Sequence, residues 1–462
     1  MSSVVTLSNG DVVVAGLTTD TLGAARIATA SLPDAYMRLY SNRTGVLVWT
    51  KQFGTQYGST SPFVTRDASD NIVMTYRANQ GTIRSNSDAI YTNKYNASGF
   101  PLLSMSYVGT NTGVEAYMPF SVSTGVAVDN MRGFIYMAGE RSHVNTYSHG
   151  VYLKYNAATG ALVYKAPFVP SHGPWTRYAG ITTDSNGYVW TVGTFYDQPQ
   201  GANTPCFMVN ILDPTNAIMG YSNWKAISGT VRSFGRAIAA AATTYTYSVG
   251  EANGVTEGGG VQTHAGGWDV MVTKQGWTGP ATLTRPFNKL YGGSGDDFAT
   301  AVAVDNTNDL VYVAGYSTSS VFQGVSNPAT ATPSAFLMTI YTNGVFRGVL
   351  FYPNAVASFV SLTSTHVILA GTATGDFEGQ AWPGTKKGFV MKVARYVPGS
   401  RRLAAVESTK AVSTPTQHIS SLRSGVINSV DRYRNLTLFS GCIMTIVCVG
   451  ALVGVYIAFH RK

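Results

Sequence analysis

One short phrase recurs seven times along this chain and constrains its fold more than any other feature. Each copy joins a turn residue, an alternating apolar stretch and a final small-residue step. The copies are Asp11–Gly16, Asn71–Tyr76, Phe134–Gly139, Tyr188–Gly193, Tyr245–Gly250, Leu310–Gly315 and His366–Gly371. Their last residues are 60, 63, 54, 57, 65 and 56 positions apart. A repeat near 60 residues predicts one supersecondary unit that packs against its own copies.

The composition favours many short strands joined by turns. Charged residues make up only 12% of the chain, whereas it contains 49 glycines and 27 tyrosines. A charged fraction this low is about half that of an average globular protein. The hydrophobic content of 45% is nevertheless enough to bury a core, so we expect an ordered chain.

Three further strand signals surround each copy of the phrase. An apolar run precedes it, as in Ala301–Asp305, and a stretch that alternates around an aromatic residue follows it, as in Val151–Tyr155. A fourth run follows a glycine turn, as in Gly45–Trp49. Alternation with a period of two between Asn, Gly and Ser turns is typical of strands in hairpins. Four antiparallel strands per unit, repeated radially, predict an all-β propeller.

The unit Tyr291–Thr318 resembles the SBBP β-propeller repeat. The resemblance rests on the glycine-rich turn Gly292–Asp297 and on the strands Ala301–Asp305 and Val311–Ser317. The other copies match more loosely, and the second departs from the pattern at Thr75-Tyr76. The resemblance implies a seven-bladed propeller and little about activity, because proteins with these repeats are mostly uncharacterised surface or secreted proteins. We therefore predict one seven-bladed propeller of four-stranded blades over residues 1–396.

The connections between strands differ in length in a way that marks one face of this propeller. The turns from first to second and from third to fourth strand are short. The connections from second to third strand are long, as at 17–33, 251–267 and 316–334. In blades of alternating strand direction, the long connections all emerge on one face. Long loops on a rigid scaffold are where binding usually occurs, although loops also tolerate insertion without function. We expect other proteins to bind at this face.

The charge pattern argues against a nucleic-acid partner. The net charge is +9, but the basic residues are scattered through the repeats. The sequence contains no nucleic-acid-binding motif and no long run of Lys or Arg. We expect partners other than nucleic acid.

The sequence contains no recognisable catalytic or cofactor motif. Asp296-Asp297 resembles a calcium turn, but no closing Glu follows, and such Asp residues more often bond backbone amides. The histidines lack the spacing of a zinc site, and no nucleophile elbow, phosphate loop or dinucleotide fingerprint is present. Cys206 stands alone in the repeats, so no disulfide framework forms there. These observations predict no enzyme, no cofactor and no metal.

Two N-glycosylation sequons fall in the same kind of turn. Asn42 and Asn96 each lie between the predicted third and fourth strands of neighbouring blades, in Asn-Arg-Thr and Asn-Ala-Ser. A third sequon, at Asn435, lies next to an apolar segment and is too close to a membrane to be modified. Asn42 and Asn96 are therefore the candidate glycosylation sites.

The C-terminal part predicts a single membrane anchor. Residues 436–459 contain no charge over 24 residues, which at about 1.5 Å per residue is enough to span a bilayer core of about 30 Å. A short basic tail, 460–462, follows, and basic residues flank both ends, so the orientation stays open. Before the span we expect a linker, 397–414, and a juxtamembrane amphipathic helix, 415–435. Within the linker, Arg402–Val406 is the candidate for the fourth strand of the last blade.

Five residues of this segment are candidates for helix–helix contacts. Leu422, Val426 and Val430 belong to an apolar stripe of the juxtamembrane helix, and a stripe outside the bilayer needs a partner. Gly450 and Gly454 form a small-xxx-small step that lets a second helix approach closely, although glycine is common in such helices.

Two functions fit this organisation. The first is a membrane-anchored propeller displayed outside the cytoplasm, at the cell surface or in an organelle lumen, as a protein-interaction, adhesion or assembly module. The alternative is an accessory structural subunit of a large organellar or surface membrane complex, held by its C-terminal helix. The usable sequons favour the first function. The absence of a signal peptide at the start of the sequence and the apolar stripe favour the second.

Overall fold

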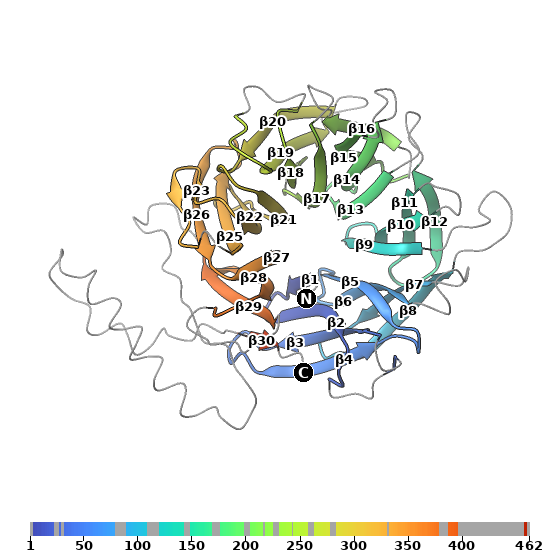
Figure 1. Ribbon diagram of the computed structural model, residues 1–462. Coiled ribbons are helices and arrows are strands. Elements are labelled where there is room, and N and C mark those ends of the chain that lie inside the picture. Colours follow the sequence, from blue (N-terminus) through green and yellow to red (C-terminus); the bar gives the residue numbers. More distant parts are fainter. Residues whose placement is uncertain are drawn as a thin grey trace, which may run out of the picture.

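The regular structure of this protein consists of β-strands arranged in a ring (Figure 1). The computed structural model describes residues 3–22, 27–28, 32–78, 89–108, 120–142, 148–168, 176–197, 204–215, 218–224, 231–242, 244–256, 263–277, 283–329, 332–377, 387–395 and 457–459. Within these ranges, no helix is long and apolar enough to cross a membrane.

Seven four-stranded antiparallel sheets form the blades. Blade 1 contains β1 Ser3–Thr6, β2 Val12–Thr18, β3 Asp34–Tyr40 and β4 Leu47–Phe53. Blade 2 contains β5 Ser59–Arg66, β6 Ile72–Ala78, β7 Ala89–Tyr95 and β8 Pro101–Val108. Blade 3 contains β9 Phe120–Asp129, β10 Phe134–Ser142, β11 Ser148–Asn156 and β12 Leu162–Phe168. Blade 4 contains β13 Thr176–Thr183, β14 Val189–Asp197, β15 Thr204–Leu212 and β16 Ile218–Trp224.

The remaining three blades complete the ring. Blade 5 contains β17 Ser233–Ala240, β18 Tyr245–Ala252, β19 Asp269–Trp277 and β20 Leu283–Tyr291. Blade 6 contains β21 Asp297–Asp305, β22 Leu310–Ser317, β25 Ser334–Tyr341 and β26 Phe346–Tyr352, with a small hairpin of β23 Val321–Phe322 and β24 Val325–Ser326. Blade 7 contains β27 Ala355–Leu362, β28 His366–Ala373, β29 Lys387–Ala394 and β30 Ile457–Phe459.

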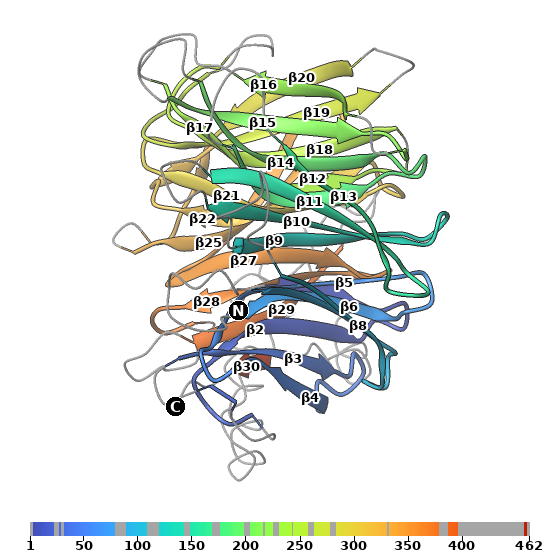
Figure 2. The same ribbon diagram turned by 90° about the vertical axis from the view of Figure 1, so that its right-hand side faces the viewer.

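The structure confirms the predicted all-β, seven-bladed propeller. The recurring phrase forms the second strand of each blade, namely β2, β6, β10, β14, β18, β22 and β28. The first strands β1, β5, β9, β13, β17, β21 and β27 surround the centre of the ring (Figure 1). The side view shows the blades following one another around the axis (Figure 2).

The hydrophobic core lies between the blades. Each cluster of buried apolar side chains joins two neighbouring sheets, as Val73 of blade 2 does with Ile135 and Leu153 of blade 3. The junction between blades 7 and 1 has its own cluster, in which Val4 and Val14 contact Ile368 and Val390. Burying a side chain of this size stabilises the fold by about 1.5–3 kcal/mol. A blade therefore depends on both neighbours for its stability.

The small-residue step of the phrase has a steric cause. A Cβ on Gly250 would lie 1.8 Å from the carbonyl oxygen of Phe234, and one on Gly315 would lie 2.0 Å from that of Phe298. In both blades the adjacent first strand carries a β-bulge opposite this glycine. The bulge brings the two backbones together, so only glycine fits there.

Among the described residues, blades 1 and 7 share no strand, because every strand of blade 1 lies within Ser3–Phe53. Side chains and apolar packing close the ring at this junction, which we call the seam. Thr6 Oγ1 donates to the Leu362 carbonyl over 2.7 Å, and Lys392 Nζ donates to the Asn42 carbonyl over 2.9 Å.

The last blade departs from our expectations at its fourth strand. That strand is β30, which pairs with Gly388, Phe389 and Val390 of β29. The expected candidate, Arg402–Val406, lies outside the described residues. The predicted helix 436–459 is wrong at its last three residues, which form β30. Without a fourth strand, the outer edge of β29 would expose unpaired backbone groups. Ile457 and Phe459, residue types that favour strands, belong to the segment that pairs with this edge.

The other C-terminal predictions lie outside the described residues. These are the linker 397–414, the juxtamembrane helix 415–435, the rest of the predicted span and the tail 460–462. The five candidate helix contacts, Leu422, Val426, Val430, Gly450 and Gly454, also lie there.

Candidate functional site

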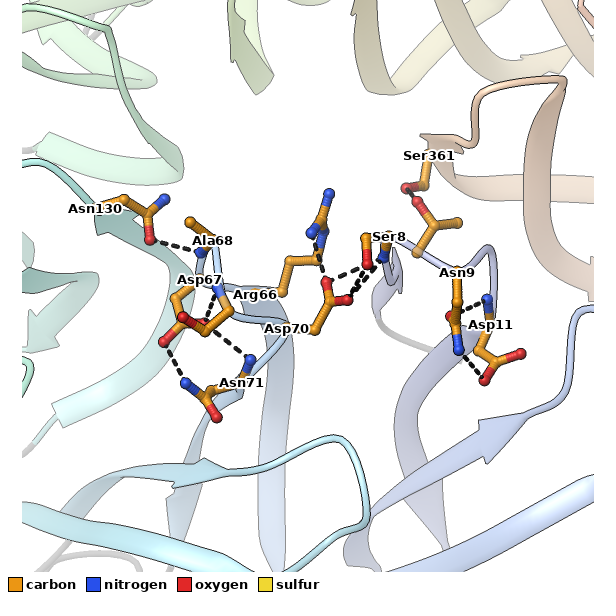
Figure 3. A network of polar contacts seen from close by, with 12 residues as sticks. Ser8, Asn9, Asp11, Arg66, Asp67, Ala68, Asp70, Asn71, Asn130 and Ser361 are labelled. Carbon is orange, nitrogen blue, oxygen red and sulfur yellow. Dashed lines mark hydrogen bonds and ion pairs between the residues drawn. The ribbon is translucent and has the colours of Figure 1, made fainter.

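The face that carries the short turns repeats the same link between blades (Figure 3). The Ser8 backbone amide donates to Asp70 of the next blade over 3.0 Å, and the Ala68 amide donates to Asn130 over 2.7 Å. The Ala242 amide donates to Asn306 in the same way over 2.9 Å. In each case a turn between first and second strands bonds the equivalent turn of the following blade. Such repetition indicates a structural role for this short-turn face.

Buried or half-buried lysines near the end of the third strand add a second set of links, which we call the lysine struts. Each Nζ donates to a carbonyl in the third-to-fourth-strand turn of the next blade. The pairs are Lys94 to Ala157 at 3.3 Å, Lys154 to Pro214 at 3.0 Å, Lys274 to Thr342 at 3.1 Å and Lys392 to Asn42 at 2.9 Å. The strut from Lys392 crosses the seam.

The two candidate glycosylation sites lie in the turns where the sequence placed them, but their side chains differ in their contacts. The Asn42 side-chain oxygen accepts a hydrogen bond from Lys392 Nζ, and its Nδ2 donates to the Asn9 carbonyl over 3.3 Å. The Asn96 oxygen accepts from the Phe100 amide of its own turn over 2.8 Å. Asn42 therefore contributes to ring closure, whereas Asn96 orders a local turn.

On the opposite face, the first residue of the third strand anchors the long connection that precedes it. Asp34 accepts hydrogen bonds from the amides of Ile27 and Ala28, both at 2.9 Å, and from Gln52 Nε2 at 2.7 Å. In blade 5 the equivalent residue, Asp269, accepts from the Ala265 amide over 2.8 Å. We call this surface the long-connection face.

Asp269 lies close to a second buried carboxylate. A Cβ on Gly292 would lie 2.0 Å from Asp269 Oδ1 and 2.7 Å from Asp297 Oδ2, so the two groups face each other across this glycine. Asp297 accepts hydrogen bonds from the Gly293 amide and the Ser319 hydroxyl, both at 2.8 Å. Burial raises the pKa of both carboxyl groups. Asp296 accepts from the Trp268 amide over 3.1 Å. These aspartates therefore serve the turn, and the part of the chain that the structure describes contains no group of three or more His, Cys, Asp or Glu that could bind a metal.

The first strands of all seven blades enclose a central cavity of about 640 Å³. Alanine, glycine, valine and isoleucine line most of it, with hydroxyls from residues such as Thr124 and Thr300. Arg236 is the charged residue among the described residues that line the cavity. Ligand sites are typically concave and mostly apolar, with a few oriented polar groups, and typically enclose about 300–1,000 Å³. The cavity fits that description.

Arg236 occupies the bulge of β17, which removes it from the regular strand register. Its Nε lies 2.8 Å from Glu251 Oε1 and 3.1 Å from Oε2, and its Nη2 also bonds Oε1. The Glu251 side chain is 1% exposed, whereas that of Arg236 is 49% exposed. Burial raises the pKa of Glu251, and the adjacent guanidinium opposes this rise. The buried carboxylate thus bonds one edge of the guanidinium, while the arginine side chain lines the cavity.

A row of aromatic rings extends from this arginine across blades 5 and 6. The Arg236 guanidinium lies 5.4 Å from the centre of the Phe234 ring. The Phe234 ring is 5.6 Å from Trp268, which is 6.2 Å from Phe298, and Phe298 stacks on Tyr316 at 4.9 Å. Phe298 and Tyr316 also line the cavity. Burial, followed by the nearby Glu251 charge, raises the pKa of Tyr316, so its hydroxyl stays protonated at neutral pH.

A second arginine–glutamate pair lies on the same face, at blades 3 and 4. Arg177 Nε lies 3.1 Å from Glu140 Oε1, and its side chain is 48% exposed. Ser233 pairs with Ala252, and Arg177 with Thr194, at the strand ends next to the long connections. Both arginines therefore lie toward the long-connection face. We call Arg177, Arg236 and their two glutamates the channel mouth.

Sequence reasoning missed the channel mouth. Glu140 and Glu251 each directly follow the last residue of the repeated phrase, and they are the acidic residues at this position. The other five blades have Leu17, Arg77, Thr194, Tyr316 and Thr372 there. That departure from the repeat was a visible signal. Its arginine partners were not visible, because a bulge and a neighbouring blade bring them into place.

Comparison with known proteins extends only to the fold. No protein-family model matches the chain, and no curated protein matches it. Similar solved structures include the propeller domain of the trilobed protease from Pyrococcus furiosus, described as having an open velcro topology. It is 8% identical, with 72% of this chain and 91% of that chain covered and a TM-score of 0.36. An α-L-arabinanase from Penicillium chrysogenum is 12% identical, with 74% and 93% covered and a TM-score of 0.39. A europium-containing methanol dehydrogenase is 10% identical, with 80% and 72% covered and a TM-score of 0.43.

These comparisons correct one prediction. We expected the chain not to be an enzyme, on the ground that it lacks familiar catalytic motifs. That exclusion is wrong as it stands, because propeller folds also occur in enzymes, among them the arabinanase and the methanol dehydrogenase above. The propeller fold by itself does not decide whether a chain is an enzyme.

Proposed function

We propose that this protein is a binding propeller that holds a partner protein at its long-connection face. The observation that carries the proposal is the channel mouth, where two guanidiniums are about half exposed, at 48% and 49%, over buried carboxylates. Arginine and aromatic side chains are the residues most enriched where binding energy concentrates. The short-turn face, by contrast, uses its polar groups to join blades.

The finer proposal concerns where the propeller is displayed. An SBBP-type propeller anchored by a helix within residues 436–456 would present this face outside the cytoplasm, as an adhesion or assembly module. The uncharged run in that segment and the sequons at Asn42 and Asn96 support this proposal. The second candidate is an accessory subunit of a membrane complex, and the apolar stripe through Leu422, Val426 and Val430 favours it.

Site-specific photo-crosslinking in cells tests which face binds. A photoreactive residue is placed at Ser320, which is exposed on the long connection of blade 6. A matched control is placed at Met131, which is 80% exposed on the short-turn face. We expect one defined protein to crosslink from position 320 and not from 131. Crosslinking from 131 alone, or from both positions equally, would contradict the proposal.

Deleting residues 415–435 separates the two candidates. If the propeller binds its partner through the long-connection face, the crosslink from position 320 persists in the deleted chain. If the protein is an accessory subunit held by the C-terminal helix, the deletion releases it from the complex on native gels.

A further inference from the structure

Among the described residues that line the central cavity, Arg236 carries a charge and has hydrogen-bond donors without a partner. Arginine carries five N–H donors in a planar fork. Glu251 occupies the Nε–Nη2 edge of Arg236 and is its hydrogen-bond partner among the described residues. The remaining donors, on Nη1 and Nη2, belong to a side chain that lines the cavity and is 49% exposed.

We propose that this cavity binds a monocarboxylate with an apolar body, and that Arg236 forms a two-hydrogen-bond pair with its carboxylate. The end-on edge of a guanidinium matches the spacing of two carboxylate oxygens. Glu251 fixes the guanidinium plane before the ligand arrives, so little side-chain freedom is lost on binding.

The local charges favour a single negative charge on the ligand. A carboxylate bonded to the outer edge of Arg236 lies closer to the guanidinium than to Glu251, which is 1% exposed behind it. Attraction therefore exceeds repulsion, because each falls with distance. A doubly charged group such as a phosphate ester would double both the attraction and the repulsion, but the free-energy cost of removing it from water into an apolar cavity grows faster than its charge. The net charge of +9 also attracts anions over long range.

The walls of the cavity favour an apolar ligand body. Val64, Ile181 and Val302 lie on the lining, as do the rings of Phe63, Phe298 and Phe359. The Ser3 hydroxyl donates to the Val64 carbonyl, and the Thr300 hydroxyl is 2.9 Å from the Ala357 carbonyl, so both are engaged with backbone. Burying apolar ligand surface against these walls contributes about 25 cal/mol per Å².

The carboxylate has two possible sources: a free organic acid, or the carboxyl terminus of a protein chain. The first would act independently of the proposed partner binding. A protein carboxyl terminus would instead make this site part of the proposed partner binding and would rest on that proposal, because the terminus would enter the cavity from the long-connection face.

Calorimetric titration of the full chain with phenylacetate and octanoate tests the proposal. We expect both acids to bind and phenylacetamide, the neutral analogue, to bind at least tenfold more weakly. Arg236→Gln should weaken acid binding at least tenfold, and Arg236→Lys, which keeps the charge but loses the fork, should weaken it less. Arg132→Gln, on the short-turn face, is the matched control and should leave the affinity within twofold. Near-UV circular dichroism checks that each variant is folded. If Arg236→Gln does not fold, the affinity of Arg236→Lys for the acids decides the test.

A phenylalanine-ended hexapeptide with a free carboxyl terminus, compared with its amidated form, identifies the source. Binding of the free peptide alone points to a protein terminus, and binding of the small acids without either peptide points to a free acid. The proposal is overturned if phenylacetamide binds as tightly as phenylacetate, if phenyl phosphate binds more tightly, or if Arg236→Gln binds like the unmodified protein. None of these results depends on the crosslinking result, so the two proposals can fail separately.

Discussion

The two faces of this propeller use similar polar residues for different purposes. On the short-turn face, Asp70, Asn130 and Asn306 each bond a backbone amide of the preceding blade, so the same contact recurs at three junctions of the ring. On the long-connection face, the residue that follows the repeated phrase differs from blade to blade. Glu140 and Glu251 hold arginines there, whereas Tyr316 stacks on Phe298.

This difference suggests which residues stabilise the ring and which are available for binding. A contact that recurs in successive blades answers a need that all blades share, namely to stay joined to the next one. A residue that breaks the repeat, such as Arg236 in its bulge, answers no such common need. The departures from the repeat are therefore where a function specific to this chain is expected.

The largest predicted effect concerns the seam. Lys392→Met removes the strut to Asn42 and leaves a half-buried carbonyl without its charged donor, so we expect a loss of about 2–3 kcal/mol in the free energy of unfolding. Urea unfolding measures the loss, and hydrogen exchange should rise in blades 1 and 7. Lys154→Met is the matched control, because the chain itself also joins blades 3 and 4. Equal exchange in blades 1 and 7 of both variants would show that the seam is no weaker than other junctions.

A smaller effect is expected at the channel mouth, and it depends on pH. Arg236→Gln leaves Glu251 buried without its cation, so the pKa of that carboxyl rises further. When folding raises the pKa of a carboxyl group, the folded protein loses stability as pH increases from the unfolded to the folded pKa of that group. We therefore expect the stability lost by the variant, compared with the unmodified protein, to be about 1–2 kcal/mol larger at pH 8 than at pH 5. The effect is no larger because the arginine is half exposed and solvent screens the pair. Adding Glu251→Gln should abolish the pH dependence, and its persistence in the double variant would assign it to another group.

A stabilising change is predicted at the buried aspartate pair. Burial raises the pKa of Asp269, and the Asp297 charge adds to the rise. Asp269→Asn removes this repulsion, so we expect a gain of about 1 kcal/mol at pH 7. Because the folded pKa is raised, the gain should shrink as pH falls and disappear at about pH 3, below the unfolded pKa of 3.8, where the carboxyl is protonated in both states. Urea midpoints at the two pH values measure it.

Asp34→Asn is the matched control for that substitution. Asp34 holds the same position in blade 1, but both of its oxygens accept hydrogen bonds. An amide nitrogen in place of one oxygen would face a donor, so we expect a loss of about 1–3 kcal/mol. A gain in this variant would mean that the long connection contributes little to stability.

The smallest predicted effect concerns modification of the short-turn face. Asn42 is engaged with Lys392, whereas Asn96 bonds only its own turn among the described contacts. In a secretory host we therefore expect Asn96→Gln to remove a glycan and Asn42→Gln to change the mass little. Intact-mass measurement distinguishes the two. A glycan at Asn42 would show that modification precedes closure of the seam.

The sequence predicted the blades well because each strand is a local pattern. The phrase Leu310–Gly315 carries its own alternation, turn and close-packing glycine, and the structure uses all three in β22. The fourth strand of blade 7 could not be predicted, because residues 457–459 form it and they lie far along the chain from their partner β29. The channel mouth was missed for the same reason. Glu251 is conspicuous within the repeat, but Arg236 reaches it only through a bulge that no periodicity indicates.

The absence of a shared strand at the seam bears on how such a chain can change in evolution. Blades 1 to 6 are each one uninterrupted stretch of sequence, and each joins its neighbours through side chains and short linkers. A duplication or deletion of about 60 codons would then add or remove a whole blade without splitting any sheet. A single genetic step of this kind would thus change the width of the central cavity, and with it the size of the ligand that can enter.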